Sequence, residues 1–448
     1  MRKRLPVVLI VCGAFFLGLM AQKIGRLWDG ARAESPKPTT AATDGVQKDA
    51  AATLSQQAVN KQLRAISTLR YVAGSRDATG PTGVTLHDRD RSEKGINLVS
   101  SLCNNQDGSK IWPLARLMDM DGNTLHTWTF DAFSGPDADD EVAWQSPHLF
   151  ENGDLLVNSQ SLGVVRLRAD STVVWRFPEG GCHHDLDVSP DGSIYVLSGQ
   201  NREYRFQTFE HINKKAHVRD DLIIVLSEDW EKIKEVSLLD AFHNSDYDAF
   251  LFASEDESWD TARDLFHSNR VQVLDGSLEH VLPAFKANNV LISIRNFNTI
   301  AVVDMQQEKV EWVLTGMAAR QHYPSLLENG NILIFDNFDS RQGNQEFSKV
   351  VEIEPRSQQT VWSYRGDPGN GFFSVTRGMA QRLSNGNTLI VESNDGRVFE
   401  VTPDNSIVWN YINHDRVVDE HGRHTSAIPH FRRYASNFPI GWATANSD

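Results

Sequence analysis

The sequence predicts an all-β protein: a six-bladed β-propeller, preceded by an N-terminal signal-anchor segment and a flexible tether. Two observations support this fold class. From Thr82 onward the chain consists of short alternating apolar runs separated by Asn-Gly and Asp-Gly turns, which is the pattern of antiparallel hairpins. Similar runs recur roughly every 50 residues, and so small a sheet buries its faces only by stacking on neighbouring sheets. Closure of six sheets into a ring removes their free edges.

The N-terminus carries a targeting segment. Residues 1–4 are cationic, and residues 5–21 are 17 uncharged, mostly apolar positions. Residues 1–25 are therefore expected to be either a signal peptide, cut after Ala33, or an uncleaved signal anchor; Lys23 and Arg26 favour the anchor. Because the cationic flank stays in the cytoplasm, the body is expected in the bacterial periplasm, tethered to the inner membrane by a single helix.

The rest of the chain divides into a tether, the propeller and a tail. Residues 26–81 are rich in Ala, Ser, Thr, Gln and Lys and lack strand-like alternation, which predicts a tether. Apolar residues at helical spacing within 51–71 predict one short helix in it. The propeller is expected to span residues 82–437, and residues 438–448 are expected to form a C-terminal tail.

Composition limits the possible functions. The chain has 448 residues, with 44 Lys and Arg against 59 Asp and Glu, and a net charge of −15. This acidic balance lacks the basic surface that nucleic acids require, and 23% charged residues exclude a polytopic membrane protein. Cys103 and Cys182 permit at most one disulfide in the exported body, and the sequence leaves open whether they pair.

Four runs show the repeated hairpin most clearly. They are HLFENGDLLVNS from His148, DVSPDGSIYVLS from Asp187, SLLENGNILIFD from Ser325 and RLSNGNTLIVES from Arg382. A later strand of several units ends in Trp, at Trp175, Trp312, Trp362 and Trp409. A partial unit near 85–130 is followed by units that open near 145, 184, 267, 322 and 376, which makes six. A solenoid is the alternative, but neither end shows a capping repeat.

Histidines recur at one position of this repeat. His184, His267 and His322 each lie eight or nine residues before the glycine of a hairpin turn. The inner strand of a propeller blade begins there, beside the central axis, so these imidazoles are expected to converge on one axial pocket. A single histidine is more often a surface or hydrogen-bonded residue, but three at matching positions favour a site.

Other polar clusters carry weaker signals. His414, His421, His424 and His430 lie near acidic residues, but their irregular spacing on a predicted loop favours solvent exposure over a metal site. The sequence contains no Walker-type loop and no GxGxxG at a strand-to-helix turn, which disfavours nucleotide-dependent enzymes. We therefore expect no metal and no cofactor.

Several runs, taken in their order, resemble one enzyme family. They are GVTLHDRDRSEKGINLV from Gly83, LMDMDGNTLHTW from Leu117, CHHDLDVSPDG from Cys182, DLFHSNRVQVLDG from Asp264, SIRNFNTIAVVD from Ser293, QHYPSLLENGNILIFDN from Gln321 and TRGMAQRLSNGNTLIVESNDGRVFEVTPDNSIVW from Thr376. Together they resemble the bacterial arylsulfate sulfotransferases (ASST-like), six-bladed propellers that move a sulfuryl group between phenols without a nucleotide (PAPS) donor. The resemblance covers residues 82–437.

The matching positions imply roles for seven residues. His322, in the Gln-His-x-Pro run, matches the family's nucleophile, which forms a sulfohistidine in a ping-pong reaction. Arg295 matches an arginine that contacts the sulfate. The other matches are His267 and Asn269 in the His-x-Asn motif, His184 or its neighbour His183, and Thr376 before the last blade. The resemblance thus implies catalytic His322, His267, His184 and Arg295, and substrate-binding Asn269, Thr376 and His183. Cys103 and Cys182 cannot form the short-range disulfide of the enterobacterial members.

Sulfuryl transfer calls for the same residue types on chemical grounds. A neutral imidazole attacks sulfur without the repulsion that an anionic nucleophile meets from the sulfate oxygens. The Arg295 guanidinium, the His267 imidazolium and the Asn269 amide are suited to stabilise charge on those oxygens. His184 is the first candidate for proton transfer to and from the phenolic oxygen, followed by His267.

Two other functions stay open from the sequence. One is a non-catalytic propeller that binds a glycan or an envelope partner, and the other is a sulfate-ester hydrolase that uses the same pocket. For the transferase, the expected partners are an aryl sulfate donor, a phenolic or hydroxyl acceptor, and the inner membrane through the N-terminal segment. No nucleic acid partner is expected, and the oligomeric state is left open.

Overall fold

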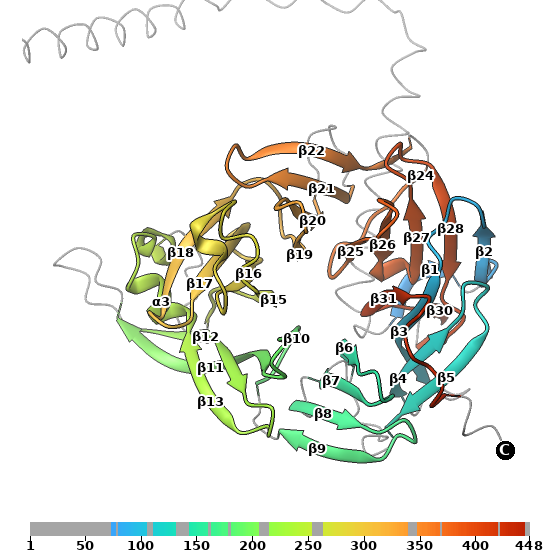
Figure 1. The fold of residues 1–448 in the computed structure, drawn as a ribbon, viewed down its shortest axis with the longest axis horizontal. Coiled ribbons are helices and arrows are strands. Elements are labelled where there is room, and N and C mark those ends of the chain that lie inside the picture. The colour runs from blue at the N-terminus through green and yellow to red at the C-terminus, as the bar shows by residue number, and fades with distance from the viewer. Residues whose placement is uncertain are drawn as a thin grey trace, which may run out of the picture. The chain divides into compact units, whose positions relative to one another are not determined.

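Six antiparallel sheets surround a central axis in the computed structural model and form the blades of a propeller (Figure 1). The structure describes residues 73–77, 79–104, 111–130, 143–159, 163–177, 181–205, 215–252, 263–338, 347–367, 370–419 and 422–443. The predicted all-β, six-bladed fold is confirmed. The predicted signal anchor at 1–25 and the predicted helix at 51–71 lie outside the described residues. Among the described residues, no helix is long and apolar enough to cross a membrane.

The first three blades are built as follows, from the inner strand outward. Blade 1 contains β31 (His430–Ala435), β3 (Gly95–Asn104), β4 (Ile111–Met118) and β5 (Thr124–Thr129). Blade 2 contains β6 (Gln145–Leu149), β7 (Leu155–Ser159), β8 (Gly163–Leu167) and β9 (Val173–Phe177). Blade 3 contains β10 (Leu186–Val188), β11 (Ile194–Arg205), β12 (Lys215–Leu226) and β13 (Lys232–Ser237), and β14 (Arg263–Asp264) pairs with β12.

The other three blades repeat this pattern. Blade 4 contains β15 (Ser268–Val273), β16 (Val290–Ile294), β17 (Thr299–Asp304) and β18 (Lys309–Thr315). Blade 5 contains β19 (His322–Leu326), β20 (Ile332–Asp336), β21 (Lys349–Glu354) and β22 (Gln359–Tyr364). Blade 6 contains β25 (Met379–Arg382), β26 (Thr388–Glu392), β27 (Arg397–Val401), β28 (Ile407–Ile412) and, outermost, β2 (Gly83–His87).

A few short elements lie between the blade strands or beside the blades. The helices are α3 (Leu238–His243), η3 (Asp248–Phe252), η4 (Pro283–Phe285) and η6 (Ser393–Asp395). Strands β23 (Gly366–Asp367) and β24 (Asn370–Gly371) form a small hairpin, and β1 (Ala73–Asp77), β30 (Gly422–Ser426) and β29 (Arg416–Asp419) form a three-stranded sheet. Part of the predicted tether therefore forms a strand, β1.

The hairpin turns form where the sequence places Asp-Gly and Asn-Gly. Gly192 and Gly330 take φ angles of 86° and 84°, a left-handed conformation that glycine adopts without a steric penalty. The following strands have almost wholly buried residues, because each faces a neighbouring blade on both sides; β7, β16, β20 and β26 are examples. The apolar clusters that result include residues of adjacent blades.

The two ends of the propeller sequence close the ring together. Strand β31 supplies the inner strand of blade 1, pairing Tyr434 with Ile96 of β3, and β2 adds the outer strand of blade 6. The partial repeat near 85–130 lacks an inner strand for this reason. The predicted solvent-exposed loop at His430 is wrong, because this residue is 3% exposed and begins β31. The pairing partner of β31 lies more than 300 residues away in the chain, so local patterns do not reveal it.

The packed region also continues beyond residue 437. Phe438, Ile440 and Trp442, which the sequence analysis assigned to a tail, pack against the apolar cluster between blades 1 and 2. Cys103 and Cys182 are both free thiols.

Side chains of the inner strands connect neighbouring blades. The Asp187 carboxylate accepts the Val273 amide N–H of the next blade at 2.9 Å, and the side-chain Oε1 of Gln272 accepts the Leu326 amide N–H at 2.9 Å. Across the closure, Gln381 accepts the amide N–H of Arg433 at 2.9 Å and donates to its carbonyl at 2.8 Å. These bonds satisfy backbone groups on the axial edge of the strands, and they hold the starts of the inner strands in fixed relative positions.

Candidate active site

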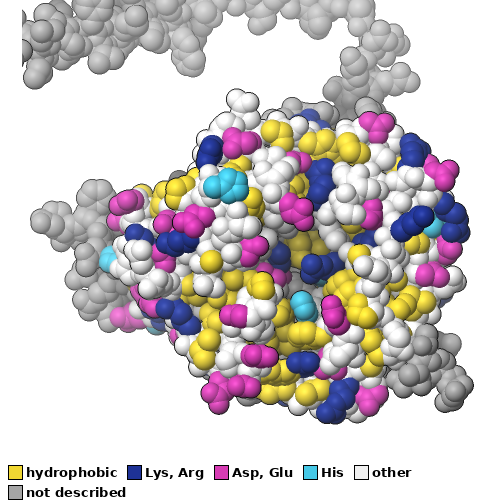
Figure 2. Space-filling model, in the orientation of Figure 1, with side chains coloured by type: hydrophobic (Ala, Val, Ile, Leu, Met, Phe, Trp, Pro, Cys, Tyr) yellow, Lys and Arg dark blue, Asp and Glu magenta, His cyan; other side chains and the backbone are white. Residues whose placement is uncertain are grey.

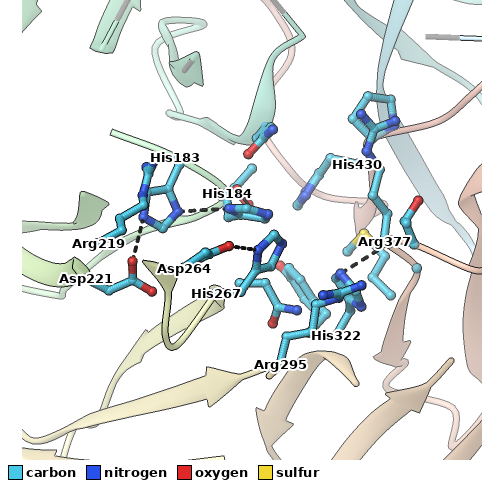
Figure 3. Close-up of a pocket in the computed structure, with 18 residues that line it drawn as sticks. His183, His184, Arg219, Asp221, Asp264, His267, Arg295, His322, Arg377 and His430 are labelled. Carbon is cyan, nitrogen blue, oxygen red and sulfur yellow. Dashed lines mark hydrogen bonds and ion pairs between the residues drawn. The ribbon is translucent and has the colours of Figure 1, made fainter. Parts of the chain in front are cut away.

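A cavity of about 440 Å³ lies on the axis where the inner strands begin (Figure 3). In the space-filling view, Lys or Arg side chains lie around a hollow near the centre of the ring (Figure 2). The residues that line the cavity are Gln145, Ser146, His183, His184, Arg219, Asp221, Asp264, His267, Asn269, Arg295, His322, Tyr323, Thr376, Arg377, Gly378, Met379, Pro429 and His430. All seven residues proposed from the sequence are among them, so the structure brings them together in one cavity.

The backbone turns side chains into this cavity in the same way in five blades. A non-glycine residue with positive φ precedes or begins the inner strand: Ser146 (44°), His184 (56°), His267 (49°), Tyr323 (49°) and Arg377 (58°). All five line the cavity. Irregular strand pairing follows directly in blades 2, 4 and 5. Left-handed backbone at such residues costs about 1–3 kcal/mol each, and a folded chain retains it where the surrounding structure, and often function, requires it.

The His322 ring is held as a single neutral tautomer. Its Nδ1–H donates to the Asn337 side-chain oxygen at 2.8 Å and to the Arg320 carbonyl at 3.0 Å. On the other side, the Arg377 amide N–H donates to Nε2 at 3.2 Å. Nδ1 faces only acceptors and Nε2 faces a donor, so the proton lies on Nδ1 and the lone pair on Nε2.

Burial keeps this imidazole neutral. His322 is 7% exposed, and burial, together with the charges of Arg295 and His267, lowers its pKa to about 3. An imidazole with such a pKa holds a free lone pair at every pH at which the protein is expected to work. This is the state that a nucleophile requires.

Asn337 fixes the orientation of His322 from the next hairpin strand. Strand β20 pairs its Phe335 with His322, and Asn337 follows β20 directly, so the hairpin brings the two side chains together. The Asn337 NH₂ group donates to the carbonyls of Ser374 at 2.7 Å and Arg377 at 2.8 Å. A flipped amide would set its oxygen against those two carbonyls. The Asn337 oxygen is therefore directed at Nδ1 of His322.

His267 is paired with a carboxylate. Its Nδ1 is hydrogen-bonded to Asp264, which β14 places beside β12 in parallel register with Arg219. Burial alone would raise the pKa of Asp264, but the hydrogen bond and charge of His267 outweigh it and lower that pKa. The Asp264 carboxylate accepts the Nδ1–H of His267, which fixes the orientation of a ring that lines the cavity.

His183 and His184 form a second linked pair. His183 Nε2 lies 3.1 Å from the Ser198 carbonyl and 3.6 Å from the Asp221 carboxylate, so this nitrogen carries a proton. The two Nδ1 atoms are 2.9 Å apart, so one of the two rings donates a hydrogen bond to the other there. The His184 ring packs edge-on against His267, with ring centroids 5.0 Å apart. Burial, and then the charge of His183, holds the pKa of His184 well below its ordinary value, which favours the neutral form.

The remaining predicted residues surround the same space. Arg295 follows β16 and donates to the Asn296 side chain at 3.1 Å. Asn269 uses one amide hydrogen on the Gln321 carbonyl at 2.9 Å, and its oxygen has no hydrogen-bond partner among the described residues. The amide thus keeps one N–H and its buried oxygen unused among the described residues. The Thr376 hydroxyl lies 3.3 Å from both polar atoms of the Asn394 amide.

Comparison with known proteins identifies the family. The arylsulfotransferase (ASST) family model matches residues 146–414, more than half of the chain. The chain belongs to the arylsulfotransferase family. No curated protein matches it. Among solved structures, a protein of unknown function from Bacteroides caccae matches with 12% identity, a TM-score of 0.44, and coverage of 71% of this chain and 93% of that one.

A second solved structure gives a similar comparison. The virginiamycin B lyase from Staphylococcus aureus is 11% identical, has a TM-score of 0.36, and covers 77% of this chain and 88% of its own. Structures this distant do not indicate the chemistry of this arylsulfotransferase family member.

Several residues that line the cavity of this arylsulfotransferase family member were not predicted from the sequence. Arg219 and Asp221 lie on β12, away from the inner-strand position at which the histidines recur. Asp264 and Arg377 stand inside quoted runs, three residues before His267 and one after Thr376, and that proximity was the available signal. Asn337 is the last residue of the run quoted from Gln321, but it lies 15 positions after His322, and its role arises only through the hairpin. Among the described residues, no group of three or more His, Cys, Asp or Glu is arranged to hold a metal ion.

Buried histidines predict a pH dependence of stability. Burial lowers the pKa of His322 to about 3 and that of His148 to about 4, and it holds those of His184 and His430 well below the ordinary value. An unfolded chain protonates histidine near pH 6.5. Below that pH the unfolded state binds more protons than the folded state, so the free energy of unfolding decreases as the pH falls. Three carboxyl groups whose pKa values burial raises, those of Asp187, Asp220 and Asp336, act in the opposite direction, whereas the lowered pKa values of His126 and His414 add to the effect of the four histidines.

We therefore expect the Tm to decrease steadily from about pH 6.5 to pH 4. Thermal unfolding followed by circular dichroism at a series of pH values measures this. A His148→Gln variant, which removes one of the four groups, should show a shallower decrease. A Tm that stays constant or rises between these pH values would contradict the account.

Proposed function

We propose that the protein transfers a sulfuryl group from an aryl sulfate ester to a phenolic or hydroxyl acceptor without a nucleotide donor. The reaction is ping-pong and proceeds through a sulfohistidine on His322. The observation that supports this most is the locked Nδ1–H tautomer of His322, whose Nε2 lone pair faces a cavity with three guanidinium groups. The family assignment supports the reaction class.

In the first half-reaction, His322 Nε2 attacks sulfur in line with the aryl oxygen. The N–S bond forms as the S–O(aryl) bond breaks, and the phenolic oxygen takes a proton from the His267 imidazolium. In the second half-reaction, neutral His267 removes the proton of the acceptor hydroxyl. That oxygen attacks sulfur, and the N–S bond breaks to return the lone pair to His322.

The geometry favours His267 over His184 as the acid and base. His267 lies against the Asp264 carboxylate, which is the geometry of an ion pair, whereas burial holds the pKa of His184 well below its ordinary value and favours the neutral form. A leaving phenolate needs a group that is protonated before the reaction. His184, packed against His267, then serves to orient that ring.

Fixed donors offset the charge on the sulfuryl oxygens. The Arg295 guanidinium lines the cavity beside His322 and contributes to the low pKa of that imidazole. The Arg377 amide N–H, which bonds to Nε2 in the resting structure, is released when Nε2 bonds to sulfur and becomes a donor for a sulfuryl oxygen. The N–H that Asn269 does not use on Gln321 adds a further donor.

We also propose that the propeller acts in the periplasm while attached to the inner membrane. The cationic residues 1–4 and the apolar residues 5–21 support this placement. The physiological donor and acceptor are then small phenolic compounds or envelope hydroxyl groups that reach the outer side of that membrane.

The test of the proposed function is release of nitrophenol from 4-nitrophenyl sulfate by the purified full-length protein, with and without phenol as acceptor. Release that depends on the acceptor, together with formation of phenyl sulfate, is the expected result. Release at the same rate without an acceptor would indicate a sulfate-ester hydrolase. An absence of release under both conditions would favour a binding propeller.

A further inference from the structure

The hairpin of β11 and β12 extends blade 3 beyond its neighbours. The two strands pair continuously from Ile194 and Leu226 to Arg205 and Lys215, whereas β10 pairs only with the first residues of β11. Because β11 runs antiparallel to β10, the extension lies at the end where β10 begins. That end of the inner strands carries the cavity, so the extension forms part of the cavity wall.

The two faces of this hairpin have different partners. Side chains alternate along a strand, so Arg219 and Asp221 share one face of β12 and Asp220 lies on the other. Asp220 accepts hydrogen bonds from the Ser237 hydroxyl at 2.7 Å and the Leu239 amide at 3.1 Å, where α3 packs. Arg219 and Asp221 line the cavity. The hairpin thus presents one arginine and one aspartate to the substrate space.

The two carboxylates that line the cavity, Asp221 and Asp264, both have hydrogen-bond or ion-pair partners. Asp221 accepts the Ser268 amide N–H at 2.7 Å and lies 3.6 Å from His183, and Asp264 is paired with His267. Arg219, which is half-buried, makes no hydrogen bond or ion pair with any residue that the structure describes. Its charge acts on Asp264 only at longer range.

A glycine makes room for the Arg219 guanidinium. Gly199 lies opposite Asp221 on β11, and a Cβ at this position would approach Nε of Arg219 to 2.8 Å and its terminal nitrogen to 3.1 Å. The side chain therefore rests over a surface without a competing side chain. An arginine held in this way at a cavity wall, without a protein partner, is suited to bind an anionic group of a ligand.

We propose that Arg219 binds a second anionic group on the aryl ring, so that the preferred substrates are aryl sulfates and phenols that also carry a carboxylate or sulfate. This inference rests on the proposed function. The departing and the attacking phenolic oxygens occupy the same position in line with His322, so donor and acceptor share one aryl site. Arg219 lies on one side of His184 and His267 in Figure 3, and His322 and Arg295 lie on the other. An aromatic ring whose sulfated oxygen lies at His322 directs the substituent on its opposite side toward Arg219.

The charge of the cavity supports the same substrate class. Three guanidinium groups, of Arg219, Arg295 and Arg377, face the two carboxylates, and each carboxylate has a histidine partner. A sulfate monoester brings one negative charge to the His322 end. A second anionic group on the ring brings a second negative charge to the Arg219 end of the cavity. There the anionic group replaces water around the half-buried guanidinium.

Binding without a donor tests the inference separately from catalysis. The probes are 4-hydroxyphenylacetate and its neutral amide, 4-hydroxyphenylacetamide, titrated calorimetrically into the full-length protein. We expect the wild type to bind the anion about tenfold more tightly than the amide. Arg219→Gln should bring this ratio close to one, whereas Arg168→Gln, a change of an exposed arginine on the β8–β9 turn, should leave it unchanged.

A second variant changes the position of the guanidinium without removing its charge. Gly199→Ala places a methyl group against Arg219, whose flexible end can shift, so the variant is expected to fold and to show an intermediate ratio. A ratio that is the same in the wild type and in Arg219→Gln would overturn the inference. So would an equal loss of affinity for both probes, which would make Arg219 a support for the Asp264–His267 pair instead.

Kinetics then distinguishes this inference from the proposed function. With 4-nitrophenyl sulfate as donor, the ratio of kcat/KM for the two acceptors should follow the binding ratio in each variant. A binding preference that Arg219 controls, in a protein that transfers no sulfuryl group, would refute the proposed function and keep the anion site. Transfer to both acceptors with equal kcat/KM would refute the anion site and keep the proposed function.

Discussion

Replacement of His322 by alanine is expected to lower acceptor-dependent transfer from 4-nitrophenyl sulfate by at least about a thousandfold, because no other group replaces the nucleophile. Nε2 of His322 holds the available lone pair that faces the Arg377 amide, and the variant removes it. Initial rates of nitrophenol release, with phenol as acceptor, measure the loss.

A matched control separates this loss from a general effect of losing a histidine. His280 is exposed and makes a hydrogen bond to the Ser277 carbonyl outside the cavity, so His280→Ala should keep the wild-type rate. Thermal unfolding of both variants checks that they are folded. A folded His322→Ala protein with more than a tenth of the wild-type transfer rate would show that another residue carries the sulfuryl group.

Replacement of Asn337 by alanine is the second large effect, with a fall in transfer rate of about 10–100-fold expected for a group that orients a reactive imidazole. The change removes the stronger of the two acceptors for Nδ1–H and leaves the Arg320 carbonyl at 3.0 Å. The ring can then rotate or carry its proton on Nε2, and in either case the lone pair no longer faces the sulfur. Asn337 is thus a positioning residue that acts through His322.

A spectroscopic measurement distinguishes positioning from a loss of structure. Nitrogen NMR of histidine-labelled protein should show the Nδ1–H tautomer of His322 in the wild type and a mixture of tautomers in Asn337→Ala. The control is Asn289→Ala, which also removes a buried asparagine, bonded to the Ala284 carbonyl and Glu311 far from the cavity. It should lose stability without losing activity. A slow Asn337→Ala variant whose His322 keeps the wild-type tautomer would refute the positioning role.

Local sequence patterns were sufficient to predict most of the fold. The turn glycines and the alternating strands after them each lie within a dozen residues, so they mark the hairpins of blades 2, 3, 5 and 6 where the structure has them. Closure of the ring depends on β31 meeting β3 at the opposite end of the propeller sequence. No local pattern encodes this contact, and His430 was therefore misplaced on an exposed loop.

The candidate site was predictable to the extent that it follows the repeat. His184, His267 and His322 occupy equivalent positions, and the resemblance to the family added Arg295, Asn269, Thr376 and His183. Arg219 comes from the extension of the β11–β12 hairpin, whose strands are the longest that the structure describes in any blade. Asn337 reaches His322 only because β19 and β20 pair. The positive φ angles that turn five side chains inward are conformations that these residue types rarely adopt, so sequence did not indicate them.

The most direct test of the central claim is to look for the sulfuryl group on His322. The full-length protein is mixed with 4-nitrophenyl sulfate and no acceptor, digested, and analysed by mass spectrometry. The sample is kept alkaline throughout, because the N–S bond of a sulfohistidine breaks when the imidazole is protonated. The account predicts one sulfuryl group on the peptide that contains His322, absent in His322→Ala and discharged by phenol as phenyl sulfate forms. Transfer to phenol without this adduct, or an adduct on another residue, would contradict it.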